Sequence, residues 1–216
     1  MQLVYSDLKS LVNTSHIYLP YDFIFGKLVQ DKKIKRLSGG VISDSSSFQY
    51  IGTDLESDIL ACRDKPFYIV SAHNYNLPST WFKFHSLIGD LSQQCTEDIF
   101  IHLPYYNLDA ARHFRNIQNK KITKTIMANS PELHHVHLRS EATNALIEFR
   151  NNGFRCQYSR KGSHAKAYIF DNQVAIVGSF NFTSQAMYKN NELGLLIFGD
   201  EVKRLKKFLQ ENALAR

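Results

Sequence analysis

The sequence predicts an α/β fold, with a mixed β-sheet that carries helices on both faces. Short apolar segments of strand length alternate along the chain with longer amphipathic segments that have the period of a helix. With 216 residues, 44% of them hydrophobic, the chain can bury one sizeable core. Because no low-complexity linker or internal repeat divides it, we expect a single domain over residues 1–216, in which the role of residues 1–50 is open.

The first half of the chain carries local signals for three kinds of element. The segment DKKIKRLSGGVISDSSSFQY fits either a hairpin that turns at Gly39 and Gly40 or a basic loop. TDLE at 53–56 fits a capping box that opens a helix through Cys62. PFYIVSA (66–72) and DIFIHLP (98–104) predict strands, and STWFKFHSLIGDLSQ between them predicts a helix with Trp81, His85, Ile88 and Leu91 near one face.

The second half continues the alternation. NLDAARHFRNIQ predicts a helix, and another begins behind Ser140 and closes at Gly153, a residue type typical of the C′ position. FRCQYS predicts the strand that follows. The last segment, DEVKRLKKFLQENALA, predicts a helix with Val202, Leu205, Phe208 and Leu209 on one face and its lysines mostly outside.

Charge and cysteine usage restrict the class of protein. The formal net charge of +6, from 26 Lys and Arg against 20 Asp and Glu, suits a polyanionic partner but does not by itself identify one. Cys62, Cys95 and Cys156 lie far apart without a CxxC pair, which argues against a disulfide framework or a zinc ribbon. The N-terminus lacks a signal-peptide pattern and no apolar stretch reaches the length of a membrane span, so we expect a cytoplasmic protein that does not bind membranes.

Residues 162–184, GSHAKAYIFDNQVAIVGSFNFTS, carry the strongest functional signal. The strand period of HAKAYIF places His164 and Lys166 on one face. DNQ is turn chemistry, and VAIVG reads as a buried strand. A hairpin centred on residues 172–173 would set His164 opposite Asn181 and Lys166 opposite Ser179, while Gly178 would allow a close approach beside Lys166.

These residue types suit chemistry at phosphorus. Lysine supplies a positive charge, and the amide and hydroxyl supply neutral donors for the oxygens of a phosphodiester. Histidine can attack phosphorus or move protons near neutral pH. The nearest acid, Asp171, falls in the predicted turn, and no carboxylate cluster for Mg²⁺ accompanies the motif. We therefore expect a reaction that needs neither a metal ion nor a cofactor.

The spacing His164-x-Lys166-x₄-Asp171-x₆-Gly178-Ser179-x-Asn181 resembles the HKD signature of the phospholipase D superfamily, over about residues 141–198. The resemblance implies a metal-independent phosphodiesterase in which His164 is the nucleophile and Lys166 and Asn181 hold the phosphoryl oxygens. It further implies that Ser179 supports this clamp and that Glu192, in NNELG, fixes the tautomer of the His164 ring. Asp171 and Gly178 would support the motif structurally.

Enzymes of this superfamily use two motif histidines, whereas this chain contains one HKD motif. HHVHLRS at 134–140 lacks both the HxK spacing and the GSxN strand. A homodimer that shares one active site across its two-fold axis would supply the second His164. The pair should titrate together and give a bell-shaped pH profile. Arg139, Arg160 and Lys161 are further candidates for contacts with phosphate groups.

The resemblance leaves the substrate open, because lipids, DNA and RNA are all cleaved within the superfamily. Compact, single-motif members resemble bacterial nucleases and the catalytic domains of restriction endonucleases. The basic charge and the absence of a signal peptide favour a DNA-cleaving restriction or defence endonuclease, or its catalytic domain, with target recognition supplied by a separate domain or subunit. The alternatives are a phospholipid hydrolase of cardiolipin or phosphatidyl type, a nonspecific DNA or RNA nuclease, and a binding protein with an inactive site.

Overall fold

The computed structural model describes residues 1–37, 41–72, 81–115, 117, 121–159 and 162–213. By its internal contacts the chain divides into two compact units, Met1–Pro66 and Phe67–Arg216, and each is described by itself. The expectation of a single domain over the whole chain stays a prediction. No helix in the described part of the chain has both the length and the apolar character needed to cross a membrane.

The N-terminal unit packs helices against a small antiparallel sheet with the strand order β1-β3-β2. Ile34 pairs with Tyr50, so the basic segment does form a hairpin, although its predicted turn at residues 39–40 lies outside the described residues. Asp54, rather than Thr53, caps the third helix by accepting a hydrogen bond from the Ser57 amide. The elements are β1 (Gln2–Val4), α1 (Tyr5–Thr14), α2 (Tyr21–Gln30), β2 (Ile34–Arg36), β3 (Ser47–Tyr50) and α3 (Leu55–Ala61).

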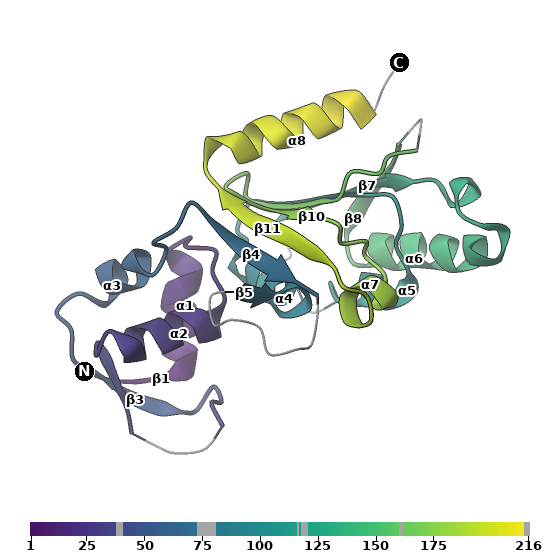
Figure 1. Ribbon diagram of the computed structural model, residues 1–216. Helices are drawn as coiled ribbons and strands as arrows, with labels where there is room; N and C mark the ends of the chain where they lie inside the picture. Colours follow the sequence, from purple (N-terminus) through teal and green to yellow (C-terminus); the bar gives the residue numbers. More distant parts are fainter. Residues whose placement is uncertain (38–40, 73–80, 116, 118–120, 160–161, 214–216) are drawn as a thin grey trace. The chain divides into compact units, whose positions relative to one another are not determined.

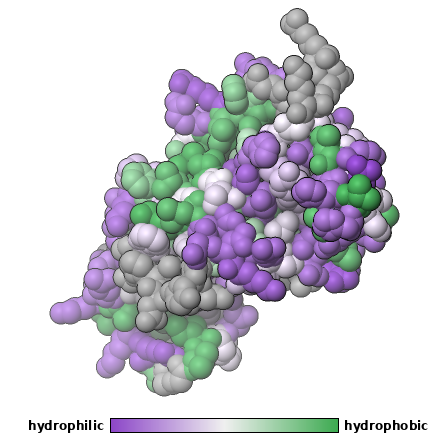
Figure 2. Space-filling view, turned by 45° about the vertical axis from the view of Figure 1, so that its right-hand side comes forward, coloured by the Kyte–Doolittle hydropathy of each residue, from purple (hydrophilic) through white to green (hydrophobic). Residues whose placement is uncertain are grey.

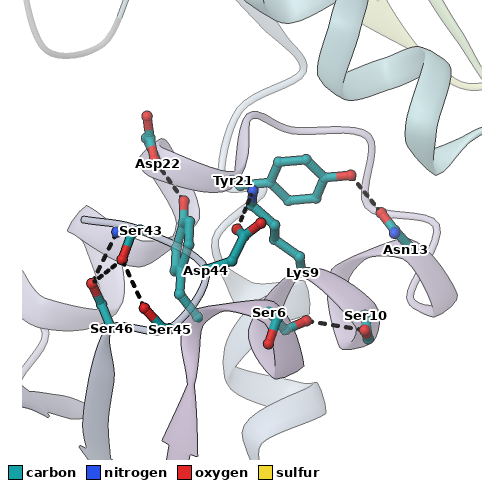
Figure 3. Close-up of polar contacts among 11 residues, drawn as sticks. Ser6, Lys9, Ser10, Asn13, Tyr21, Asp22, Ser43, Asp44, Ser45 and Ser46 are labelled. Atoms are coloured by element: carbon teal, nitrogen blue, oxygen red, sulfur yellow. Dashed lines mark hydrogen bonds and ion pairs between the residues drawn. The ribbon is translucent and has the colours of Figure 1, made fainter. Parts of the chain in front are cut away.

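Polar side chains connect the helices of this unit to the segment before β3 (Figure 3). The ammonium of Lys9 lies 2.8 Å from the carboxylate of Asp44, and the Tyr21 hydroxyl donates to Asn13 at 2.7 Å. Ser43, Ser45 and Ser46 join one another through their hydroxyl groups. The unit holds eight Lys and Arg against eight Asp and Glu, so its formal charge is balanced.

The C-terminal unit is built on an eight-stranded mixed sheet with the order β5-β4-β11-β10-β9-β6-β7-β8 (Figure 1). The outer pairs β4/β5, β6/β7 and β7/β8 are parallel, and the four pairs from β4 through β6 are antiparallel. The strands are β4 (Phe67–Ser71), β5 (Trp81–Lys83), β6 (Asp98–Leu103), β7 (Thr123–Asn129), β8 (Phe154–Ser159), β9 (Ala167–Phe170), β10 (Val174–Gly178) and β11 (Leu193–Phe198).

Helices cover both faces of this sheet, as the sequence predicts. On one face Val202 and Leu209 of α8 pack against Ile169 of β9 and its neighbours. On the other face the Phe84 ring of α4 packs against Tyr168 of β9, with ring centroids 5.1 Å apart. The helices are α4 (Phe84–Gln94), α5 (Leu108–Arg112), the 3₁₀ turns η1 (Pro131–Leu133) and η2 (Val136–Leu138), α6 (Arg139–Asn151), α7 (Ser184–Tyr188) and α8 (Asp200–Ala213).

Three local expectations were wrong in detail. Trp81 lies in β5 rather than in a helix, because residues 81–83 pair with the edge of β4 and the helix begins only at Phe84. The helix after Asn107 is short, ending at Arg112. Phe208 is 60% exposed, so the buried face of α8 is narrower than the apolar pattern predicts. Gly153, by contrast, follows the α6 cap with φ +83°, as predicted for a C′ glycine.

Candidate active site

His164 and Lys166 lie in an extended segment immediately before β9, at the edge of the sheet. The predicted register was wrong by one residue, since Ala167 pairs with Val177 and Phe170 with Val174. Three residues, 171–173, connect the two strands, and Asp171 and Asn172 have left-handed φ values of 51° and 56°. The longer connection shifts the pairing, so the motif residues do not face Asn181 and Ser179 as ladder partners.

Side chains from two neighbouring strands hold the segment that carries His164. Asn129, at the end of β7, accepts a 2.8 Å hydrogen bond from the Ser163 amide and donates to the Ser163 carbonyl at 3.4 Å. His102 of β6 donates Nδ1–H to the Ala165 carbonyl at 3.2 Å. Because a carbonyl only accepts, this bond fixes the tautomer, and burial lowers the pKa of His102. The two buried side chains thus replace missing ladder bonds around the histidine.

The polar groups of His164 and Lys166 are largely available to a ligand. The His164 side chain is exposed, and its ring lies 6.4 Å from that of Tyr105, centroid to centroid. The Lys166 ammonium donates to the His164 carbonyl at 2.9 Å. An ammonium has three donors, so two remain after this bond. The lysine can therefore support the backbone of the histidine and still bind an anionic oxygen.

Ser179 and Glu192 meet at the ends of β10 and β11. The Ser179 hydroxyl donates to the Glu192 carboxylate and accepts from the Leu193 amide at 3.1 Å. Asn190 donates to the other carboxylate oxygen at 3.1 Å. Within the described residues no hydrogen bond joins Glu192 to His164, so its expected role in fixing the His164 tautomer stays a prediction. The carboxylate instead orders the loop between α7 and β11.

Asn181 and Gly178 complete the motif at the end of β10. The Oδ1 atom of Asn181 is buried and has no hydrogen-bond partner among the described residues, which leaves this amide unsaturated until a ligand binds. Gly178 pairs with Gly194, and a Cβ at position 178 would lie 2.5 Å from the Leu193 carbonyl oxygen. The glycine is thus required by the backbone of β11, which passes this close to it.

Asp171 lies at the opposite end of β9 from His164, in a fully structural setting. Its buried carboxylate accepts hydrogen bonds from the backbone amides of residues 96, 97 and 98, from the Thr96 hydroxyl and from the Cys95 thiol. Burial opposes ionisation of Asp171, but the thiol and amide donors outweigh it and hold the pKa below its usual range. The carboxylate fastens the hairpin to the segment before β6.

Tyr105 and His134 form an aromatic wall beside His164. The His134 ring lies 5.3 Å from Tyr105 and 5.0 Å from Tyr106, both edge-on, and its Nε2 has no partner among the described residues. Burial lowers the pKa of His134. Sequence reasoning missed Tyr105, His102 and Asn129. The available signal was their position, since each follows or ends an apolar strand, where polar side chains of neighbouring strands meet.

The remaining candidates are not brought to the site by contacts of their own. Arg139 donates to the carbonyl groups of Glu132 and His134 and so orders the turns before α6. Arg160 and Lys161 lie outside the described residues and stay predictions, as does a role for His73 or Tyr75. Among the residues that the structure describes, no three His, Cys, Asp or Glu side chains gather as a metal ion would require.

Comparisons with solved structures show the fold. Nuc from Salmonella typhimurium, a phospholipase D family member, superposes with a TM-score of 0.52 at 17% identity, over 67% of this chain and 91% of that chain. NucT from Helicobacter pylori gives a TM-score of 0.46 at 18% identity, over 57% and 82% of the two chains. Phosphatidylserine synthase from Haemophilus influenzae Rd KW20 gives 0.47 at 15% identity, over 73% and 44%.

The comparison with protein families covers most of the C-terminal unit. Residues 89–212 match the family model described as cardiolipin synthase, PLD-like domain. Among curated proteins, none matches the sequence. The matched region includes the whole HKD motif, together with Asn129 and His102, which hold its histidine. The expectation of an enzyme is confirmed, and the chain belongs to the PLD-like family, as a phosphodiesterase of the phospholipase D superfamily.

Proposed function

We propose that the chain is a metal-independent DNA endonuclease of a restriction or defence system, or its catalytic domain, and that it acts as a homodimer. The distribution of charge carries the choice of DNA. Residues 67–216 hold eighteen Lys and Arg against twelve Asp and Glu, so the whole surplus of +6 lies on the unit that contains the site. A cationic surface around a phosphodiester site attracts a polyanion over distances of about 10 Å, the Debye length at moderate salt.

In this mechanism the imidazole of His164 attacks phosphorus and forms a P–N bond while the P–O bond to the leaving strand breaks. The His164 ring of the second copy, in its protonated form, gives its proton to the leaving oxygen. Water then attacks the phosphohistidine, the second ring takes up a water proton, and the P–N bond breaks to restore His164. One ring must be neutral and the other charged, so the rate should fall on both sides of an optimum pH.

The other motif residues would stabilise the transition state. Lys166 keeps two N–H donors for a phosphoryl oxygen, and the unsaturated amide of Asn181 offers two more. Ser179 would support the clamp through the carboxylate of Glu192. Sequence preference would come from a separate recognition domain or subunit.

One observation favours the second candidate, a phospholipid hydrolase. The turns η1 and η2 expose three apolar side chains, Leu133, Val136 and Leu138, on the segment whose His134 packs against Tyr105 of the site. Exposed apolar residues beside a catalytic site are expected of an enzyme that works at a lipid interface. A nonspecific nuclease acting on DNA and RNA is the third candidate.

A parallel assay separates the candidates. The purified protein and a His164→Ala control would be incubated in EDTA with plasmid DNA, with a structured RNA, and with vesicles that contain cardiolipin. We expect cleavage of DNA by the wild type alone, with binding that weakens steeply as salt rises. Turnover of vesicles alone would establish the lipid candidate, and comparable rates on RNA would establish the nonspecific one. Cleavage that requires an added divalent cation would contradict metal independence.

A further inference from the structure

One half of a sheet face in the C-terminal unit has no helix over it. Leu193 is 55%, Phe67 49% and Leu195 38% exposed, whereas the alternating residues Leu196 and Tyr68 are 0% and 2% exposed on the other face. Figure 2 shows hydrophobic side chains gathered to the left of its centre, while hydrophilic ones dominate the right. The open face consists of Val177 of β10, Leu193, Leu195 and Ile197 of β11, and Phe67 and Ile69 of β4.

The register makes these side chains one continuous surface. Val177, Leu195 and Ile69 pair directly across three adjacent strands, and Ile197 pairs with Phe67 in another row. Helix α8 reaches only the border of this surface, where Val177, Ile197 and Leu205 pack against the core cluster. Mixed sheets of this kind normally bury both faces, and a contiguous apolar patch on one of them marks an interaction site.

The open face is continuous with the active site. The Leu193 amide donates to the Ser179 hydroxyl, which in turn binds Glu192, so the patch begins at the motif itself. All six of its side chains are apolar, which makes the surface complementary to a copy of itself. The site meanwhile contains a single motif histidine, although the proposed reaction uses two.

We propose that the open face is the dimer interface, and that its occupant is the open face of a second copy of this chain. In an isologous contact the patch meets its own equivalent around a two-fold axis. With the axis running along the strands, both catalytic ends point the same way, and the second His164 is brought beside the first. The inference rests on the proposed two-histidine mechanism, for which it identifies the partner and the contact surface.

The test places a charge in the open face. Leu195→Glu puts two carboxylates into the interface of each dimer, one from each copy, and neither has a counter-charge there. We expect the dissociation constant to rise by about 100-fold or more, seen as a halved mass in analytical ultracentrifugation, with loss of phosphodiesterase activity in proportion to the monomer. The matched control is Ile147→Glu, an exposed apolar residue of α6 in the same unit, which should remain dimeric and active.

A second variant guards against unfolding. Leu195→Cys conserves size and should cross-link to itself under mild oxidation, giving a covalent dimer, whereas Ile147→Cys should not. A monomeric wild type, or a Leu195→Glu protein that stays dimeric, overturns the inference. If the wild type cleaves DNA while Leu195→Glu stays dimeric and active, only the interface fails. If the wild type is a dimer that Leu195→Glu disrupts but cleaves no DNA, the interface stands and the proposed substrate fails.

Discussion

The two ends of strand β9 place residues of one motif in opposite environments. At one end His164 is exposed and Lys166 uses one of its donors, so polar groups remain for a ligand. At the other end Asp171 is 2% exposed and its carboxylate accepts hydrogen bonds from five donors. The first end is built to bind something absent from the chain, and the second is already satisfied by the chain itself.

The difference divides the motif into chemistry and architecture. A saturated, buried carboxylate has no lone pair to offer a substrate, whereas removing it leaves several buried donors unpaired. Mutations at the two ends should therefore separate: those beside His164 should lower turnover without unfolding the protein, and those beside Asp171 should do the reverse.

The largest effect is expected from His164→Ala. Losing the proposed nucleophile should lower kcat by about 10³-fold or more, because no other described residue of the motif can form the P–N bond. Since the imidazole is exposed, the melting temperature should hardly change. Steady-state kinetics together with thermal unfolding would check both. Activity within tenfold of the wild type would remove His164 from the mechanism.

Lys166→Ala should follow, with a loss of about 10²- to 10³-fold in kcat, the usual effect of removing one charged donor from a transition state. It also removes the bond to the His164 carbonyl. Lys166→Met, which keeps the length of the side chain, serves as a packing control and should be equally impaired. Full activity in Lys166→Met would show that the ammonium does not bind the phosphoryl group.

Asn129→Ala tests whether the chemical end depends on positioning. It removes both side-chain bonds to Ser163, one residue before His164. We expect kcat to fall by about 10- to 100-fold while KM stays within a factor of two, because a displaced nucleophile reacts more slowly without binding less substrate.

Asn129→Asp keeps the acceptor for the Ser163 amide and should retain more activity than Asn129→Ala. Equal losses in the two variants, or a loss confined to KM, would contradict a positioning role.

At the structural end, Asp171→Asn should leave the kcat of the folded protein within a factor of two. Its amide replaces one acceptor oxygen by a donor that faces donors already present, so we expect the free energy of unfolding to fall by about 1–3 kcal/mol. Urea denaturation and single-turnover rates measure the two quantities. A fall in kcat without a fall in stability would assign Asp171 to the chemistry.

The smallest effect concerns acid stability. The pKa of Asp171 is lowered in the folded state, so its stabilisation is present above the unfolded value of about 3.9 and is lost as the pH falls through the folded value. Between the two values the unfolded chain binds more protons, and stability should decline with falling pH. Denaturation curves below pH 4 should be flatter for Asp171→Asn than for the wild type. Parallel curves would mean that other carboxylates dominate.

The sequence by itself determined the α/β class, most strand positions and the motif, because hydrophobic period and residue spacing are local properties. FRCQYS forms a strand with the bounds predicted, and Gly153 ends its helix as expected. It could not determine the register of the hairpin, since that depends on how many residues the turn takes when Asp171 is drawn into a distant loop. Trp81 joined the sheet for a similar reason, the free edge of β4.

Only the tertiary structure decided which residues surround His164 and which face of the sheet stays open. Asn129 and His102 are 35 and 62 positions away in the sequence, and no local pattern connects them to Ser163 or Ala165. They meet because parallel strands β6 and β7 end at the same edge of the sheet where β9 begins. The open face likewise follows from where α8 crosses the sheet, since apolar side chains on β4 and β11 look the same in sequence whether or not a helix covers them.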